Sequence, residues 1–478
     1  MTPLRLAVVG AGVSGLSAAR ELVRASREEA VPARVTVFEV EGRVGGRVLS
    51  AELRGQRVDL GAESMLVRDP STIETLRSLG LEEELVRPGT TSASIWSGRR
   101  LVPIPKGTSL GVPLHPLHPE VVRLLGPLGS LRAFLEPWLL GPTVTPDDPL
   151  GPFLVGRLGG MAVRRLVDPL LGGVYAGPAE LLSVGAVAPH LLAALGRDRS
   201  LLRGLRRQPA PAGGAIGFIS LRSGLQTLAE KLADSLEPSS LRLGTPVKGV
   251  WPGQSGQVRV AAGAGAEEFD GVVLALPAPS ASELLQGLAP ELSRQLRRQM
   301  YSNVATVTLA YPEAALDRRP PGSGFLVPRF PGRVVTACTF MDQKWPHLRR
   351  PGTLLLRASA GGHGDDWPLE VDDATLVTSV HTHLRRHLGL RQVPLEARVQ
   401  RWAPALPQYR AGHLAWRDSV EAEVAALPHP VVLAGAAYHG VGMEACLRDG
   451  VRAAQALWQR LGSAVPMDTR GRAGDGHR

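Results

Sequence analysis

The sequence predicts an α/β fold in which one parallel-sheet domain is interrupted by two insertions. An apolar strand at residues 4–9 leads through a glycine-rich loop into a helix. Two more buried strands, at 270–277 and 431–435, lie far along the chain and end in proline or glycine turns. The intervening segments differ in character, because 71–214 is leucine-rich with helical spacing whereas 278–414 contains β-rich runs.

The composition is that of a folded chain with several domains. The 478 residues include 44% hydrophobic and 21% charged side chains, and their number suggests two or three domains at roughly 150 residues each. The net charge of +10 is compatible with a solvated basic surface and equally with an acidic partner. Aromatic residues make up only 4% of the chain, which argues against a base-stacking surface, so no nucleic-acid partner is expected.

Cysteine content and the N-terminal residues predict a cytoplasmic protein. Two cysteines, Cys338 and Cys446, cannot form a disulfide framework. Because a core strand begins at residue 4, no separate signal peptide is expected. The longest uncharged stretch, 424–443, contains two prolines and three glycines, so it is not expected to span a membrane.

The glycine-rich loop after the first strand is the most informative motif. In GxGxxG, the first glycine allows a tight turn, the second lets the backbone approach a pyrophosphate, and the third lets helix and strand pack closely. The residues expected to bind a cofactor here are Gly10, Gly12, Val13, Ser14 and Gly15. A second strand, 34–38, ends at Glu39, whose carboxylate can accept hydrogen bonds from ribose hydroxyls. Together these features predict a Rossmann-like dinucleotide site.

A second glycine-rich segment favours a flavin over a nicotinamide. Residues 41–47 read EGRVGGR, in which Gly45 and Gly46 permit another close backbone approach, and Arg43 and Arg47 can offset phosphate charge. A short strand farther on turns into Gly61, Ala62 and Glu63. The combination resembles the two-dinucleotide-binding flavoproteins related to amine oxidases and phytoene desaturases, which implies FAD as the cofactor.

Distant segments are expected to complete the FAD site. Residues 241–247 resemble the strand that places a valine, here Val247, against the adenine of the cofactor, and 270–277 resembles the return strand of the superfamily. After the strand at 431–435, glycines precede a helix, which suits contacts to the pyrophosphate or the isoalloxazine ring. The residues expected there are Gly435, Val441, Gly442 and Met443. His439 is either a flavin donor or an ordinary loop histidine.

These segments divide the chain into a discontinuous domain and two insertions. The FAD-binding domain is expected at 1–70, 215–277 and 415–462, a helical insertion at 71–214, a substrate-binding insertion at 278–414, and a mobile tail at 463–478. In the helical insertion, 120–140 alternates apolar faces with arginines. That pattern fits a core-facing helical pair or a helix lying on a membrane, which leaves a substrate-entry role and peripheral contact with the inner face of the membrane open.

Beyond the cofactor motifs, the sequence resembles the bacterial porphyrinogen oxidases of haem biosynthesis over nearly its whole length. Residues 101–113 resemble their PIPxGTxxGxP segment, and 168–177 resemble the SGVYAG stretch beside the flavin. Further matches at 336–347, 401–413 and 435–446 follow in the family's order.

The resemblance implies FAD-dependent oxidation of a porphyrinogen to a porphyrin, in which six electrons leave in three steps and O₂ is reduced to hydrogen peroxide. The Gram-positive branch, which 101–113 resembles most, is associated with coproporphyrinogen III and its product coproporphyrin III. Mitochondrial and chloroplast relatives act on protoporphyrinogen IX and have an arginine where an ungapped alignment puts Ala93. The alternatives are therefore protoporphyrinogen IX oxidation or another amine-oxidase-type activity. The oligomeric state is not predicted.

The chemistry asks for binding residues rather than a catalytic side chain. No catalytic residue and no metal site are expected, because flavin N5 accepts the hydride and the cofactor carries the difficult step. A macrocycle needs apolar walls, with cations at the rim for its carboxylates. The wall residues expected from the resemblance are Gly173, Val174 and Tyr175. The candidate propionate partners, unless they form only a solvated hairpin, are Arg99, Arg100 and Lys106. Trp402 and Tyr409 either line the flavin or fill the core.

Overall fold

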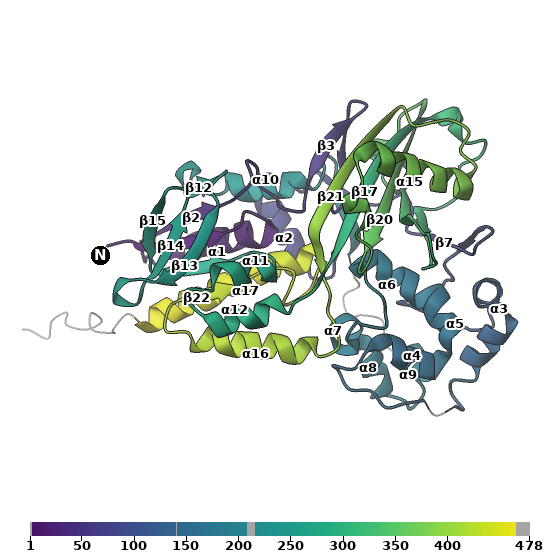
Figure 1. The fold of residues 1–478 in the computed structure, drawn as a ribbon, viewed down its shortest axis with the longest axis horizontal. Coiled ribbons are helices and arrows are strands. Elements are labelled where there is room, and N and C mark those ends of the chain that lie inside the picture. The colour runs from purple at the N-terminus through teal and green to yellow at the C-terminus, as the bar shows by residue number, and fades with distance from the viewer. Residues whose placement is uncertain (1, 140, 208–215, 465–478) are drawn as a thin grey trace, which may run out of the picture.

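A five-stranded parallel sheet forms the centre of one half of the molecule (Figure 1). The structure is a computed structural model that describes residues 2–139, 141–207 and 216–464, so nearly all of the tail predicted to be mobile lies outside the described residues. In spatial order the strands are β12 (Leu241–Arg242), β2 (Ala33–Phe38), β1 (Leu4–Val9), β16 (Gly271–Leu274) and β22 (Val431–Leu433). All neighbouring pairs are parallel, and the predicted Rossmann-like α/β fold is confirmed.

Both faces of this sheet are covered, as a parallel sheet requires. Leu6 and Val8 of β1 face one core, and the intervening Ala7 and Val9 face the other. The first core is closed by α1 (Val13–Glu28), α10 (Gln226–Asp234) and α17 (Met443–Ala464). The second is closed by β13 (Val247–Pro252), β14 (Val258–Ala262), β15 (Gly265–Phe269), α11 (Ala278–Leu284), α12 (Pro290–Arg297) and α16 (His413–Ala426). Helices α11 and α12 thus pack on the cofactor domain although the sequence suggested the second insertion, because apolar spacing identifies a helix but not the layer that it covers.

A seven-stranded mixed sheet forms a second layer, drawn at the upper right of Figure 1. In spatial order it contains β21 (Glu396–Pro407), β17 (Tyr301–Pro312), β20 (Thr353–Gly362), β19 (Val335–Phe340), β18 (Gly324–Leu326), β7 (Ser94–Trp96) and β8 (Leu101–Pro103). Helix α15 (Asp373–Leu388) packs on it through Leu376, Val380 and Leu384. Strands β7 and β8 come from the segment expected to be helical, because so short a hairpin leaves little periodic signal in the sequence.

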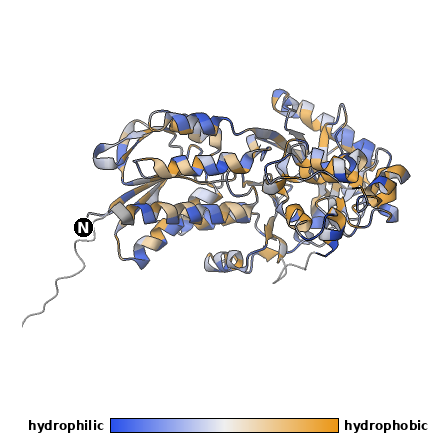
Figure 2. Cartoon of the chain, turned by 90° about the horizontal axis from the view of Figure 1, so that it is seen from below, coloured by the Kyte–Doolittle hydropathy of each residue, from blue (hydrophilic) through white to orange (hydrophobic). Residues whose placement is uncertain are grey.

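The rest of the first insertion is a helical cluster with its own leucine-rich core, which Figure 2 shows as abundant apolar residues. Its main helices are α3 (Pro119–Phe134), α4 (Leu150–Leu158), α6 (Asp168–Tyr175), α8 (Pro189–Leu195) and α9 (Leu201–Arg206). Helix α3 is broken at Gly126 (φ 76°, ψ 165°), just before Pro127, so it is in effect a pair of short helices. None of the helices within the described ranges is long and apolar enough to cross a membrane.

Candidate cofactor site

The loop between β1 and α1 leaves open space beside its backbone. Gly10 has a φ of +103°, and a Cβ there would lie 2.6 Å from the carbonyl oxygen of Ala275. A Cβ on Gly15 would lie 1.9 Å from the carbonyl oxygen of Gly10, whereas a Cβ on Gly12 would meet no described atom within 4 Å. Packing therefore demands the first and third glycines, and the space beside Gly12 lies where the unpaired N–H groups at the start of α1 favour an anion.

Glu39, at the end of β2, holds two loops together. Its side chain is buried, with Oε2 accepting a hydrogen bond from the Ala11 N–H (2.7 Å) and Oε1 accepting one from the Glu41 N–H (2.9 Å). A carboxylate has about four acceptor positions, so room remains for ribose hydroxyls. That contact with a ribose stays a prediction.

The second glycine-rich segment packs against the first. The Gly45 N–H donates to the Ala11 carbonyl (2.8 Å), and a Cβ on Gly46 would lie 3.4 Å from Cα of Gly12. Both Gly45 (φ +107°) and Gly46 (φ +56°) have left-handed backbone that a bulkier residue adopts only with strain. The two loops therefore form one surface around the space beside Gly12.

The arginines of this segment bind the protein itself. Arg43 donates to the Gly46 carbonyl (3.0 Å) and pairs with Glu41 (2.8 Å). Arg47 donates through Nε to the Pro404 carbonyl (2.9 Å) in β21. In these positions they brace the loop, and a contact of either with phosphate stays a prediction.

Gly61 and Trp402 mark a close approach between the two halves of the molecule. A Cβ on Gly61 would lie 2.0 Å from the Arg47 carbonyl oxygen and 3.1 Å from the indole of Trp402. The Trp402 Nε1 is buried and has no hydrogen-bond partner among the described residues. An orphaned indole N–H costs free energy, and a polar edge of a flavin would supply the missing acceptor.

A buried ion cluster beside this point was missed by the sequence interpretation. Glu63 pairs with Lys344 (Oε1 to Nζ, 2.5 Å) and with Arg357 (Oε2 to Nη2, 2.9 Å) of the seven-stranded sheet region. Burial alone would raise the pKa of Glu63, but the two cations outweigh it and hold the pKa below its ordinary value. Arg357 also donates to the Gly61 carbonyl (2.8 Å). The cluster thus fixes the cofactor domain against the second sheet. Ala62, which lies between Gly61 and Glu63 in the sequence, is exposed.

The C-terminal loop is held by a buried carboxylate. Asp449 on α17 accepts hydrogen bonds from the Gly435 N–H (2.7 Å) and from Nδ1 of His439 (2.7 Å), and Nε2 of His439 lies 3.1 Å from Glu421. His439 is therefore a loop histidine with a carboxylate at each nitrogen. Just beyond it, a Cβ on Gly442 would meet no described atom within 4 Å, and α17 begins at Met443. This loop offers a second helix N-terminus with open space beside it.

Two other residues predicted near the cofactor have clear positions. Tyr409 is buried, donates to the Ala436 carbonyl (2.6 Å) and accepts from the Gly440 N–H (2.8 Å), so it fills the core and supports the C-terminal loop. The expected strand 241–247 is split into β12 and β13 by a turn at Gly244 (φ +61°), and Val247 begins β13.

Helix α6 carries the residues predicted to line the substrate site. Gly173 and Val174 are exposed, and burial raises the pKa of Tyr175 to about 12. Beside α6 lies a narrow pocket of about 20 Å³, room for one or two water-sized groups. Its polar lining includes Asp168, Arg329, Arg333 and Thr336.

The predicted propionate partners lie at and after the β7–β8 hairpin. Arg99 and Arg100 are exposed at the tip of the β7–β8 hairpin, on the outer edge of the seven-stranded sheet, and Lys106 is exposed in the loop that follows. None of them lines the described pocket beside α6. A role of Arg99, Arg100 and Lys106 in binding propionates stays a prediction. The sequence did not single out Arg329 and Arg333, because an arginine-rich sequence gives no signal that distinguishes these two from the others.

Comparison with known proteins gives a consistent picture. A family model described as "Flavin containing amine oxidoreductase" matches residues 13–458. The chain is similar to the coproporphyrinogen III oxidase of Bacillus subtilis (30% identity, 93% of this chain and 95% of that protein). It is also similar to that of Mycobacterium tuberculosis (32% identity, 97% of this chain and 100% of that protein). A crystal structure of an Exiguobacterium protein superimposes with a TM-score of 0.84 and 31% identity, covering 96% of this chain and 100% of that one.

Proposed function

Because the chain belongs to the flavin-containing amine oxidoreductase family, we propose that it is an FAD-dependent oxidase that converts coproporphyrinogen III to coproporphyrin III. The similarity to proteins named coproporphyrinogen III oxidase, over nearly the full length of both chains, supports this substrate. The proposed reaction removes six electrons in three two-electron steps, with O₂ reduced to hydrogen peroxide, as part of haem biosynthesis.

One observation carries the proposal: four segments of the chain present either space beside a glycine that no described side chain fills or a buried donor without a partner. Two of these segments, the loops at Gly12 and Gly442, present glycines whose Cβ would meet no described atom and lie at the start of a long helix. The others contribute Gly46 and the unpaired Nε1 of Trp402. When bound there, FAD supplies the hydride acceptor for the oxidation.

We further propose that the pocket beside α6 receives a carboxylate of the substrate. Arg333 is half-buried and donates to the Val327 carbonyl (2.9 Å), and Arg329 is paired with the buried Asp168 (3.2 Å). Burial raises the pKa of Asp168. Its single carboxylate faces the two guanidinium groups of Arg329 and Arg333 in the pocket lining, so one positive charge is not offset there. The pocket's volume suits a single carboxylate rather than a macrocycle. Gly173 and Val174 would then contact the ring.

The test is aerobic turnover by the purified chain, followed by porphyrin fluorescence. Coproporphyrinogen III and protoporphyrinogen IX are compared at equal concentrations, with apoprotein and apoprotein plus FAD as matched controls. The proposal predicts FAD-dependent formation of coproporphyrin III and of three molecules of hydrogen peroxide per porphyrin. Faster turnover of protoporphyrinogen IX would contradict the assignment of coproporphyrinogen III as the substrate. Turnover without FAD would contradict the role of FAD as the hydride acceptor.

Peripheral membrane contact in the cytoplasm is a separate proposal, supported by the second half of α3 and the turn after it. Leu128 is 83% exposed and Trp138 is 61% exposed, and Leu131, Leu135 and Leu139 are also exposed. Such a contiguous apolar stripe is uncommon on a protein that stays in water. Flotation with vesicles of anionic phospholipid tests it: Leu128→Ser with Trp138→Ser should abolish flotation of the protein with the vesicles, whereas Val393→Ser, at an exposed position on another surface, should not.

A further inference from the structure

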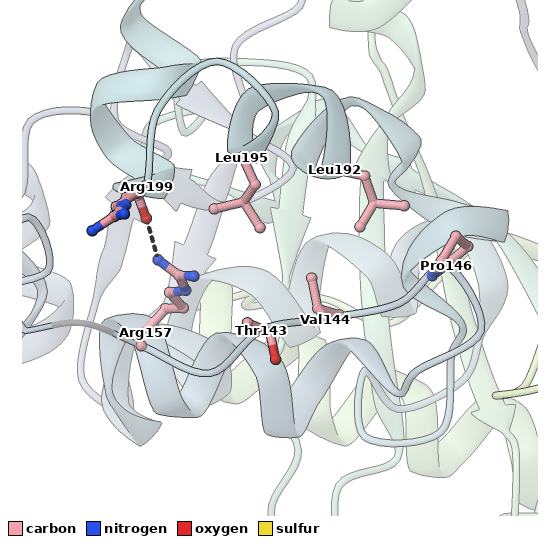
Figure 3. A pocket seen from close by; sticks show the side chains of 8 residues that line it. Thr143, Val144, Pro146, Arg157, Leu192, Leu195 and Arg199 are labelled. Atoms are coloured by element: carbon pink, nitrogen blue, oxygen red, sulfur yellow. Dashed lines mark hydrogen bonds between the residues drawn. The ribbon is translucent and has the colours of Figure 1, made fainter.

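A second cavity lies in the helical cluster, and its described lining shares no residue with the candidate cofactor site. Its volume is about 600 Å³, within the range of about 300–1,000 Å³ typical of small-molecule sites. It lies between α4, α8 and the loop 141–146 (Figure 3). The apolar part of its wall consists of Val144, Pro146, Leu192 and Leu195.

The two charged residues of the described lining are both arginines, and they lie together at one end. Figure 3 shows the side chain of Arg157 extending toward Arg199, while Leu192 and Leu195 point into the cavity from α8. The Arg157 Nη1 donates to the Arg199 carbonyl (2.7 Å). Arg199 is exposed, and its guanidinium has no partner among the described residues. One end of the cavity is therefore cationic and the rest is apolar.

Arg157 is not fully satisfied by the protein. Its side chain is 7% exposed and pairs with the buried Glu136 (3.2 Å), yet its Nε is buried with no acceptor among the described residues. Glu136 is also bound by the Ser200 hydroxyl (2.5 Å) and the Leu201 N–H (2.8 Å), so its charge is shared among several donors. Gly141 lines the cavity next to this group, since a Cβ there would lie 2.7 Å from Nε. Two guanidinium groups, those of Arg157 and Arg199, thus share one carboxylate, Glu136, and the remaining positive charge at this end of the cavity favours an anionic ligand.

We propose that this cavity binds a single-chain aliphatic carboxylate, with the carboxylate at the end formed by Arg157 and Arg199. The hydrocarbon chain lies against Leu192, Leu195 and Val144. A planar guanidinium matches the geometry of a carboxylate, and each buried methylene strengthens binding by up to about fourfold. The site is independent of the flavin chemistry.

Isothermal titration calorimetry on the full chain with its cofactor tests the proposal, with dodecanoate as the probe below its micelle concentration. We expect one saturable site per chain. Octanoate, which lacks four methylenes, should bind at least tenfold more weakly. Dodecyltrimethylammonium has a slightly longer alkyl chain and the opposite charge, and it should also bind at least tenfold more weakly. Absence of saturable dodecanoate binding, or equal affinity for the cation, would overturn the proposal.

Two variants locate the site without disturbing the buried ion pair of Arg157. Leu195→Trp fills the cavity and should weaken dodecanoate binding at least tenfold, while Val155→Trp, on the exposed face of α4, is the matched control and should not. Arg199→Gln should weaken dodecanoate binding severalfold and leave dodecan-1-ol binding unchanged. Dodecanoate binding that survives Leu195→Trp unchanged would show that the ligand lies elsewhere.

Discussion

Replacing Gly12 by alanine should weaken FAD binding without lowering the stability of the apoprotein. The backbone of Gly12 (φ −73°, ψ 176°) is accessible to any residue, and the new Cβ would meet no described atom within 4 Å. The apoprotein should therefore change its free energy of unfolding by less than about 1 kcal/mol, in the stabilising direction. With the pyrophosphate of FAD beside Gly12, the same methyl displaces one or two hydrogen bonds to a charged group, each worth about 1.5–3 kcal/mol. One lost bond corresponds to about a 10- to 150-fold rise in the dissociation constant of FAD.

The assay is titration of apoprotein with FAD, followed by quenching of flavin fluorescence, together with urea unfolding of the apoprotein. Gly265→Ala in β15 is the matched control, since its Cβ would also meet no described atom and it lies away from the loops. Unchanged FAD affinity in Gly12→Ala would refute the placement of the pyrophosphate. Unfolding of the Gly12→Ala apoprotein would refute the claim that the space is empty of protein.

Three further predictions concern buried titratable side chains. Asp449→Asn keeps the shape of the residue but removes the charge that holds Gly435, and FAD titration should show about tenfold weaker binding; equal binding would contradict this. Glu63→Gln leaves two cations without their carboxylate and should lower the free energy of unfolding in urea by about 3 kcal/mol; a change below 1 kcal/mol would count against it. Burial lowers the pKa of His413 from 6.5 to about 4. As the pH falls, His413 is therefore protonated in the unfolded chain before it is protonated in the folded protein. The free energy of unfolding should fall by up to about 3 kcal/mol between pH 6.5 and pH 4. Urea unfolding across that range should show a smaller fall in His413→Phe, and an identical fall would exclude His413 as its source.

Local patterns predicted the Rossmann-like α/β fold correctly because each of its pieces is short and can be recognised from neighbouring residues. The strand, glycine loop and helix at 4–28 needed only neighbouring residues to be recognised. Packing between segments was harder to predict. The β7–β8 hairpin joins a sheet whose other strands lie over two hundred residues away in the sequence. Its own residues do not indicate that β7 pairs with β18.

Roles of charged residues were the least predictable part of the site. Arg43 and Arg47 fit a phosphate-binding role by position, yet both donate to backbone carbonyls of the protein. Lys344, one of four lysines in the chain, pairs with Glu63 across 281 positions. Such pairs depend on the tertiary fold, and sequence spacing carries no information about them. FAD as the cofactor was nevertheless predicted correctly, because backbone glycines rather than side-chain charges define its loops.

The order of strands in the five-stranded sheet has a consequence for biosynthesis. Strand β22 and the loop before α17 are made about 400 residues after β1, yet β22 joins the same sheet and the proposed cofactor site needs that loop. On a ribosome that adds about 5–20 residues per second, the first loop waits at least about 20 seconds for its partners. If FAD binds at the proposed site, a nascent chain cannot acquire it before residues 431–443 are made, and a chain that stops at residue 428 should be colourless however well the earlier segments fold.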